Sequence, residues 1–160
     1  MWRGECGFTL TELMVTLGIV GVLSATAVPS ASTMIATQRV KTATFDIYAA
    51  TSYARSEAIK RNAVVTIAPH GGNFANGYDV QVGDVVLSSQ IGTPSVAINA
   101  PSEIPLAYNG HGRLTSPGQY QLELSSPLES NISKRCLAID MSGRPSIHVD
   151  SNHDGNCFNG

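Results

Sequence analysis

An α+β fold is predicted for this chain of 160 residues, with one long N-terminal helix packed on a C-terminal antiparallel β-sheet domain. Three observations predict it. The segment from Leu13 to Val28 carries no charged residue. Residues 30–62 repeat small apolar side chains at steps of three and four, which is the spacing of one helix face. From residue 63 onward, short apolar runs alternate with turn signals, and many short strands after a single long helix are typical of this fold class.

The N-terminal part of the helix has the length of a membrane span. Residues 8–28 form an apolar stretch of about 20 residues, which is what a helix needs to cross the bilayer core. Arg3 precedes it, on the side that would remain cytoplasmic. A secretory signal peptide places its apolar stretch before the cleavage site, so that the stretch is removed. Here the order is reversed, and we expect the helix to be kept.

Glu12 is the one charged residue inside this stretch. An ionised carboxylate within a spanning helix costs at least about 2.5 kcal/mol, so such a residue is treated as a functional group with a partner. Alternatively, Thr9 and Glu12 have the spacing of a capping box, in which Glu12 caps the first turn of the helix. The two interpretations are compatible.

Beyond residue 29 the helix is predicted to become amphipathic. Pro29 is expected to kink the helix or to loosen the preceding turn. The small residues of the apolar stripe predict close packing against a sheet. The stripe comprises Ala36, Val40, Ala43, Ile47, Ala50, Ala54 and Ala58, and the opposite face carries Gln38, Lys41, Arg55 and Lys60.

The strands are predicted from short apolar runs bounded by Gly, Pro, Asn and Ser. They are Val64–Ala68, Tyr78–Val82, Val85–Ser88, Val96–Ala100, Gln119–Ser125, Arg135–Asp140 and Ser146–Val149.

Cys136 and Cys157 both lie near the C-terminus. Two cysteines in a small extracytoplasmic domain favour a disulfide. Closing a loop of about 20 residues would contribute roughly 3 kcal/mol of stability. The alternative is a pair of free, buried thiols.

The N-terminal motif Gly7-Phe8-Thr9-Leu10-Thr11-Glu12-Leu13, followed by the apolar run, resembles the class III leader and N-terminal helix of type IV pilins and type II secretion pseudopilins. The resemblance implies that a membrane peptidase cuts between Gly7 and Phe8 and methylates the new amine of Phe8. Glu12 would then neutralise the ammonium group of a neighbouring subunit when both are buried in a filament core.

The resemblance also implies an organisation and a location. Residues 1–7 would be the cleaved leader, 8–29 the membrane and filament-core half of the helix, 30–62 the amphipathic half, and 63–160 the β-rich globular domain. The chain would cross the bacterial inner membrane once, with a periplasmic C-terminal domain, before it enters a periplasmic or cell-surface filament.

Three later segments narrow the resemblance. They are the run from Ala54 to Asn62 with the following Val64-Val65-Thr66-Ile67, and two Gly-Arg turns at residues 108–114 and 139–144. These resemble the FimT/FimU minor pilins and the H-type minor pseudopilins, and they imply the type IV pilin fold. The implied function is either a minor pilin that helps to prime assembly at or near a pilus tip, or an H-type pseudopilin of a type II secretion system. The implied partners are other major and minor pilins or pseudopilins, the prepilin peptidase and the inner-membrane assembly platform.

No enzyme is expected. The four histidines are not accompanied by Cys or acidic residues at zinc-ligand spacing. The sequence contains neither a Gly-x-Ser-x-Gly motif nor a phosphate loop. A formal net charge of −2 argues against a general nucleic-acid binder, although it leaves room for a local basic patch.

Two binding sites are nevertheless candidates. Some FimT-type minor pilins bind DNA through a C-terminal Gly-Arg-x-Arg motif, of which Gly143-Arg144-Pro145-Ser146 keeps only the first arginine. Lys134 and Arg135 could add phosphate contacts to that of Arg144. The alternative is a β-turn with a solvated arginine.

The second candidate is a calcium site. Residues 150–155 match the start of an Asp-x-Asn-x-Asp-Gly calcium loop, with Asp150, Asn152 and Asp154 as ligands. The alternative is an Asn/Asp/Gly turn held by Cys157. No other cofactor is expected.

Overall fold

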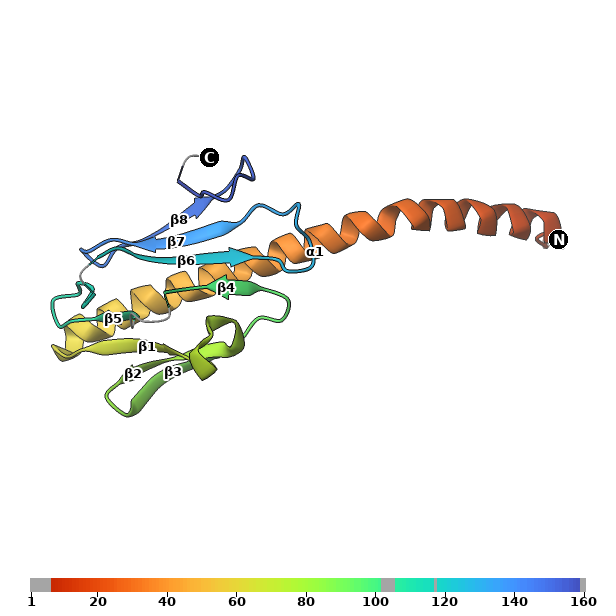
Figure 1. Cartoon of the computed structure of the whole chain (residues 1–160). Coiled ribbons are helices and arrows are strands. Elements are labelled where there is room, and N and C mark those ends of the chain that lie inside the picture. The colour runs from red at the N-terminus through yellow and green to blue at the C-terminus, as the bar shows by residue number, and fades with distance from the viewer. Residues whose placement is uncertain (1–6, 102–105, 117, 159–160) are drawn as a thin grey trace, which may run out of the picture. The chain divides into compact units, whose positions relative to one another are not determined.

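The computed structural model describes residues 7–101, 106–116 and 118–158, and for residues 26–30 it describes the backbone alone. The chain divides into two compact units, Met1–Ile35 and Ala36–Gly160. Helix α1 (Leu10–Arg61) begins in the first unit and ends in the second, and the strands follow it (Figure 1). The predicted α+β class is confirmed.

The start of α1 is closed by a reciprocal pair of hydrogen bonds. The backbone N–H of Glu12 donates to Thr9 Oγ1 at 3.3 Å, and the N–H of Thr9 donates to Glu12 Oε2 at 3.5 Å. This is a capping box, so in the single chain Glu12 satisfies a backbone donor of its own helix.

The first unit is otherwise a helix with exposed apolar side chains. Leu10 is 74% exposed and Leu23 is 62% exposed, and the large apolar residues between them are similarly open. Residue 29 lies inside α1, so the proline does not end the helix. Among the described residues, no helix combines the length and the apolar character that crossing a membrane requires.

In the second unit the apolar stripe of α1 is buried as predicted. Val40, Ala43, Ile47, Ala50, Ala54 and Ala58 are each at most 7% exposed, and Ala36 is half-buried. The same face buries two threonines, which bond to the helix itself: Thr44 Oγ1 donates to the Val40 carbonyl and Thr51 Oγ1 to the Tyr48 carbonyl, both at 2.7 Å. These side chains therefore add no unpaired hydroxyl to the core.

Within the described residues, the strands form two antiparallel sheets, each of four strands. The first sheet has the order β3-β2-β1-β5 and the second the order β4-β6-β7-β8. Their bounds are β1 Val65–Pro69, β2 Gly77–Val82, β3 Val85–Ile91, β4 Ala97–Asn99, β5 Leu106–Tyr108, β6 Tyr120–Ser125, β7 Arg135–Ile139 and β8 Pro145–Val149, and the short 3-10 turns η1 (His70–Gly72) and η2 (Phe74–Asn76) join β1 to β2. Strands were predicted at seven of these eight positions; β5 was not.

Both sheets contribute to one hydrophobic core with the second part of α1 (Figure 1). From the first sheet, Ile67 and Tyr108 are buried, and from the second, Leu122, Leu137 and Ile139 are buried. They meet the small residues of the helix stripe, which allow the helix axis to approach the strands closely. This arrangement brings turns that are distant in sequence to the end of α1.

Candidate functional site

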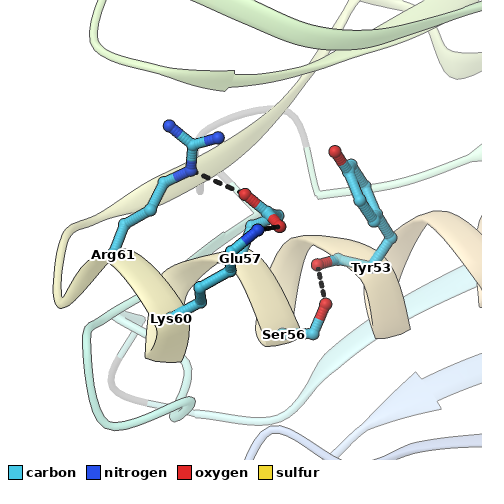
Figure 2. A network of polar contacts seen from close by, with 5 residues as sticks. All are labelled: Tyr53, Ser56, Glu57, Lys60 and Arg61. Atoms are coloured by element: carbon cyan, nitrogen blue, oxygen red, sulfur yellow. Dashed lines mark hydrogen bonds and ion pairs between the residues drawn. The ribbon is translucent and has the colours of Figure 1, made fainter.

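The C-terminal end of α1 carries a network of polar contacts around one carboxylate (Figure 2). Glu57 is only 7% exposed. Its Oε2 accepts a hydrogen bond from Arg61 Nε at 2.6 Å, and its Oε1 accepts one from Lys60 Nζ at 3.2 Å. Spacings of three and four residues place both cations beside this side chain. The hydrogen bond from Arg61, followed by that from Lys60, holds the pKa of Glu57 below its ordinary value.

Each of the two Gly-Arg turns is organised by one polar side chain near its start. Asn109 Oδ1 accepts hydrogen bonds from the backbone N–H groups of His111 at 3.0 Å and Arg113 at 3.1 Å. Asp140 Oδ1 accepts a hydrogen bond from the backbone N–H of Arg144 at 3.0 Å. It also accepts one from a serine hydroxyl in the same turn, and these bonds lower the pKa of Asp140, the serine bond most strongly. Both turns therefore have a defined backbone geometry.

Arg55 of α1 links the two turns to each other. Its Nε donates to the carbonyl of Gly112 at 2.9 Å and its Nη2 donates to the carbonyl of Ser142 at 3.3 Å. The turns are also in direct contact, because a Cβ atom on Gly143 would collide with the carbonyl oxygen of Gly112. Both glycines are buried. The end of the helix and the two turns thus form one packed junction.

The junction presents two exposed arginines on neighbouring turns. Arg113 follows the first buried glycine and Arg144 follows the second, and both side chains are exposed. Arg113 was not among the residues predicted to bind DNA. The signal that could have identified it was the repetition of the Gly-Arg turn itself.

Lys134 and Arg135 are not brought to this junction. Arg135 pairs with Val149 at one end of the β7–β8 hairpin, whereas the turn that carries Arg144 closes the other end. The two ends of the hairpin are separated by the length of β7, which is about 13 Å at 3.3 Å per residue. Lys134 Nζ forms an ion pair with Glu123 Oε1 at 2.6 Å. The structure therefore separates the predicted phosphate-binding residues into two places.

The C-terminal loop contains the predicted disulfide and the predicted calcium ligands. Cys136 of β7 is bonded to Cys157, with their Cα atoms 6.0 Å apart. The Asp150 side chain, 1% exposed, accepts a hydrogen bond at Oδ2 from the N–H of Gly155 at 2.9 Å. Asn152 and Asp154 lie in the same loop and are exposed. Within the described ranges, no group of three or more His, Cys, Asp or Glu side chains could hold a metal ion.

The predicted processing site lies directly before α1. Gly7 and Phe8 are outside regular secondary structure, and Phe8 is 82% exposed. Exposed segments outside regular secondary structure are the preferred sites of proteolytic cleavage. Residues 1–6 of the predicted leader lie outside the described part of the chain.

A family model described as "Type II transport protein GspH" matches residues 43–143. The chain belongs to the GspH family. A second model, the prokaryotic N-terminal methylation motif, matches residues 2–28 of this GspH-family chain. The predicted membership of the type IV pilin-like GspH/FimT/FimU group is therefore confirmed. The members of this group are structural pilins and pseudopilins. Such subunits assemble with other pilins and are processed by a prepilin peptidase.

Two solved structures are similar to the GspH-family chain. Both are crystal structures of the type IV minor pilin FimU from Pseudomonas aeruginosa strain PAO1. The first has a TM-score of 0.64 at 19% identity and covers 76% of this chain and 96% of that chain. The second has a TM-score of 0.61 at 20% identity and covers 74% and 99%. At this identity the likeness establishes the pilin fold alone. No curated protein sequence shows significant similarity to the chain.

The family match has an informative boundary. Residues 43–143 include Arg55, Glu57 and the first Gly-Arg turn with Arg113. The match ends beside the second turn, and the C-terminal loop that begins at Asp150 lies outside it. The junction at the end of α1 thus lies within the matched residues up to Gly143, whereas the loop lies beyond them.

Proposed function

We propose that this GspH-family chain is a minor subunit of a type IV pilus, which helps to prime assembly and lies at or near the filament tip. One observation carries the proposal: a methylation motif over residues 2–28 leads directly into a helix whose later part belongs to a body with the FimU fold. The same features also suit an H-type minor pseudopilin of a type II secretion system, which is the class that the matching family model names.

The exposed apolar residues of the first unit supply the physical basis for this role. Large side chains from Leu10 to Leu23 are more than half exposed. An apolar surface of this kind requires a cover, which the inner membrane would provide before assembly and neighbouring helices would provide within a filament. The β-rich body would then lie in the periplasm.

Glu12 would determine how neighbouring subunits align when these apolar helices assemble. Cleavage after Gly7 creates an ammonium group at Phe8, and a carboxylate buried in a filament core needs such a partner. In the single chain the carboxylate bonds to the Thr9 N–H instead. On assembly, the ammonium group of a neighbouring subunit would become its partner.

Mass spectrometry of the chain extracted from cells tests the processing step. We expect an N-methylated Phe8 and no residues 1–7. Recovery of an intact leader from cells with an active peptidase would refute the proposal at its first step.

Two substitutions at Glu12 separate charge from capping. Glu12→Ala removes both functions, whereas Glu12→Gln retains a side chain that can complete a capping box. If the charge sets the register, both variants should enter the membrane normally and both should be reduced in sheared filaments. Normal incorporation of Glu12→Gln would show that Glu12 is a helix cap and not an assembly device.

Deletion of the gene distinguishes the two filament systems. A minor pilin should be required for surface pili, which are counted directly by microscopy. A pseudopilin should instead be required for the release of folded proteins into the medium. Complementation with the intact gene is the control in both assays.

A second function, capture of DNA through its phosphates, is supported by one observation: Arg113 and Arg144 follow glycines that pack together, and both side chains are exposed. Binding would be independent of sequence, with a Kd of about 10⁻⁴–10⁻⁶ M, and would weaken steeply with salt. Arg113→Ala and Arg144→Ala should each reduce it, whereas Lys41→Ala, at an exposed position of α1, should not. Absence of a mobility shift even at low salt would exclude this function.

A further inference from the structure

One carboxylate in the C-terminal loop is buried without a full set of partners. Asp150 is 1% exposed, and its Oδ1 has no hydrogen-bond partner among the described residues. Its other oxygen, Oδ2, accepts a hydrogen bond from the N–H of Gly155 at 2.9 Å. An unpaired buried oxygen of an acidic group is costly, and such groups usually bind a cation or a set of donors. Asp150 Oδ1 is therefore an oxygen that a cation could stabilise.

The loop around this carboxylate is held at both ends. It leaves β8 at Val149, which pairs with Arg135 of β7. It returns at Cys157, which is bonded to Cys136 of the same strand. The hydrogen bond from the Gly155 N–H to Asp150 Oδ2 joins the carboxylate to the backbone of the loop five residues further on. The anchors reduce the conformational freedom that a bound ion would otherwise have to restrict.

The other two proposed ligands lie in the same loop and are bonded to each other. Asn152 Nδ2 donates a hydrogen bond to Asp154 Oδ2 at 3.1 Å, and the N–H of Asp154 donates one to Asn152 Oδ1 at 3.4 Å. A bound cation would take the place of the amide N–H at this carboxylate oxygen. Carboxylate and amide oxygens are the ligands that calcium takes, with carbonyl groups and water completing its shell.

A lysine beside the loop sets an upper limit on the affinity. Lys134 Nζ lies 3.8 Å from where a Cβ atom of Gly155 would be, and it pairs with Glu123. The carboxylate of Glu123 first, and the charge of Asp150 with it, raise the pKa of Lys134. The ammonium group is therefore always charged near neutral pH and competes with a second cation. Binding in the range of extracellular calcium modules, about 10⁻⁴–10⁻³ M, is the expected result.

We propose that the loop of residues 150–155 binds one calcium ion through the side-chain oxygens of Asp150, Asn152 and Asp154. This inference is independent of the filament system, because it depends only on the loop. Its role would be to hold the C-terminal loop in one conformation outside the cell, where calcium is abundant.

Calcium titration of the purified full-length chain in detergent, after removal of divalent ions, tests the proposal. Calorimetry should show one site with a Kd of about 10⁻⁴–10⁻³ M, and the midpoint of thermal unfolding should rise with calcium. Asp154→Asn should weaken binding at least tenfold, since the residue is exposed and its loss leaves the core intact. Asp84→Asn, in the exposed turn between β2 and β3, is the matched control and should bind like the wild type.

Three outcomes would overturn the site. The first is no binding heat and no rise in the midpoint with calcium at about 10 mM, ten times the upper limit of the expected Kd. The second is equal binding by Asp154→Asn and the wild type. The third is equal affinity for magnesium, which would indicate diffuse attraction of cations, because a flexible oxygen loop favours calcium over the smaller ion. Asp150→Asn should also weaken binding. Should that variant fail to fold, the comparison of Asp154→Asn with Asp84→Asn still decides the question.

Discussion

The packing of the two Gly-Arg turns can be tested at one atom. Gly143 has φ +80°, and a Cβ atom there would meet the carbonyl oxygen of Gly112 and lie 3.0 Å from a ring carbon of Tyr108. The substitution Gly143→Ala therefore adds a single methyl group at the contact between the turns. The chain offers a matched control in Gly83, which has φ +56° and no heavy atom within 4 Å of an added Cβ.

The expected loss can be divided into two parts. A left-handed backbone costs a non-glycine residue roughly 1–2 kcal/mol, and this applies to both substitutions. Inserting a methyl group into a closed contact costs about 1–3 kcal/mol more, and this applies to Gly143→Ala alone. The free energy of unfolding should thus fall by about 2–5 kcal/mol in Gly143→Ala and by about 1–2 kcal/mol in Gly83→Ala.

Urea and thermal unfolding of the full-length chain in detergent measure this difference. For a chain of this size, each kcal/mol corresponds to roughly 2–4 °C in the midpoint of unfolding. Equal losses in the two variants, within about 0.5 kcal/mol, would refute the reasoning. They would mean that the two turns are not in tight contact. The placement of Arg113 and Arg144 on neighbouring turns would then lose its structural basis.

Three further predictions test the rest of the domain. Cys157→Ser should lower the free energy of unfolding by about 3 kcal/mol, because the bridge joins positions 21 residues apart; a reductant should destabilise the wild type equally, and an unchanged midpoint would count against the bridge. Leu137→Ala, at a side chain that is 0% exposed, should cost about 2–5 kcal/mol, whereas Leu128→Ala, at one that is 73% exposed, should change stability by under about 0.5 kcal/mol. Glu57→Gln should destabilise the chain at neutral pH. Arg61 lowers the pKa of Glu57 from its ordinary value of 4.5. The stability that the ionised Glu57 contributes is therefore fully present above pH 4.5 and is lost as the pH falls through the lowered pKa of the folded state. A stability difference that stays constant from pH 7 to about pH 3 would contradict it.

The helix and most strands were predictable because their signals are local. The stripe from Val40 to Ala58 follows the helix period, and residues three or four apart share a face whatever the rest of the chain does. Strand β5 (Leu106–Tyr108) was missed for the opposite reason. Its three residues are all buried, so they show no alternation, and they become a strand only by pairing with β1. The division into two sheets likewise depends on which strands meet.

The candidate sites divide in the same way. Sequence alone determined the methylation motif, the capping box at Thr9 and Glu12, and the two Gly-Arg turns, because each is set by neighbours within a few residues. The disulfide was predictable from the number of cysteines and their positions near the C-terminus.

Tertiary structure alone decided what those turns do together. Arg55 bonds to carbonyl groups 57 and 87 residues away, and no local pattern encodes such partners. The same packing placed Arg113 beside the turn of Arg144, left Lys134 with Glu123 at the far end of the hairpin, and buried Asp150. The sequence determines which side chains can carry a charge. The partners of such a side chain and its exposure to water depend on which distant backbone segments the core brings into contact.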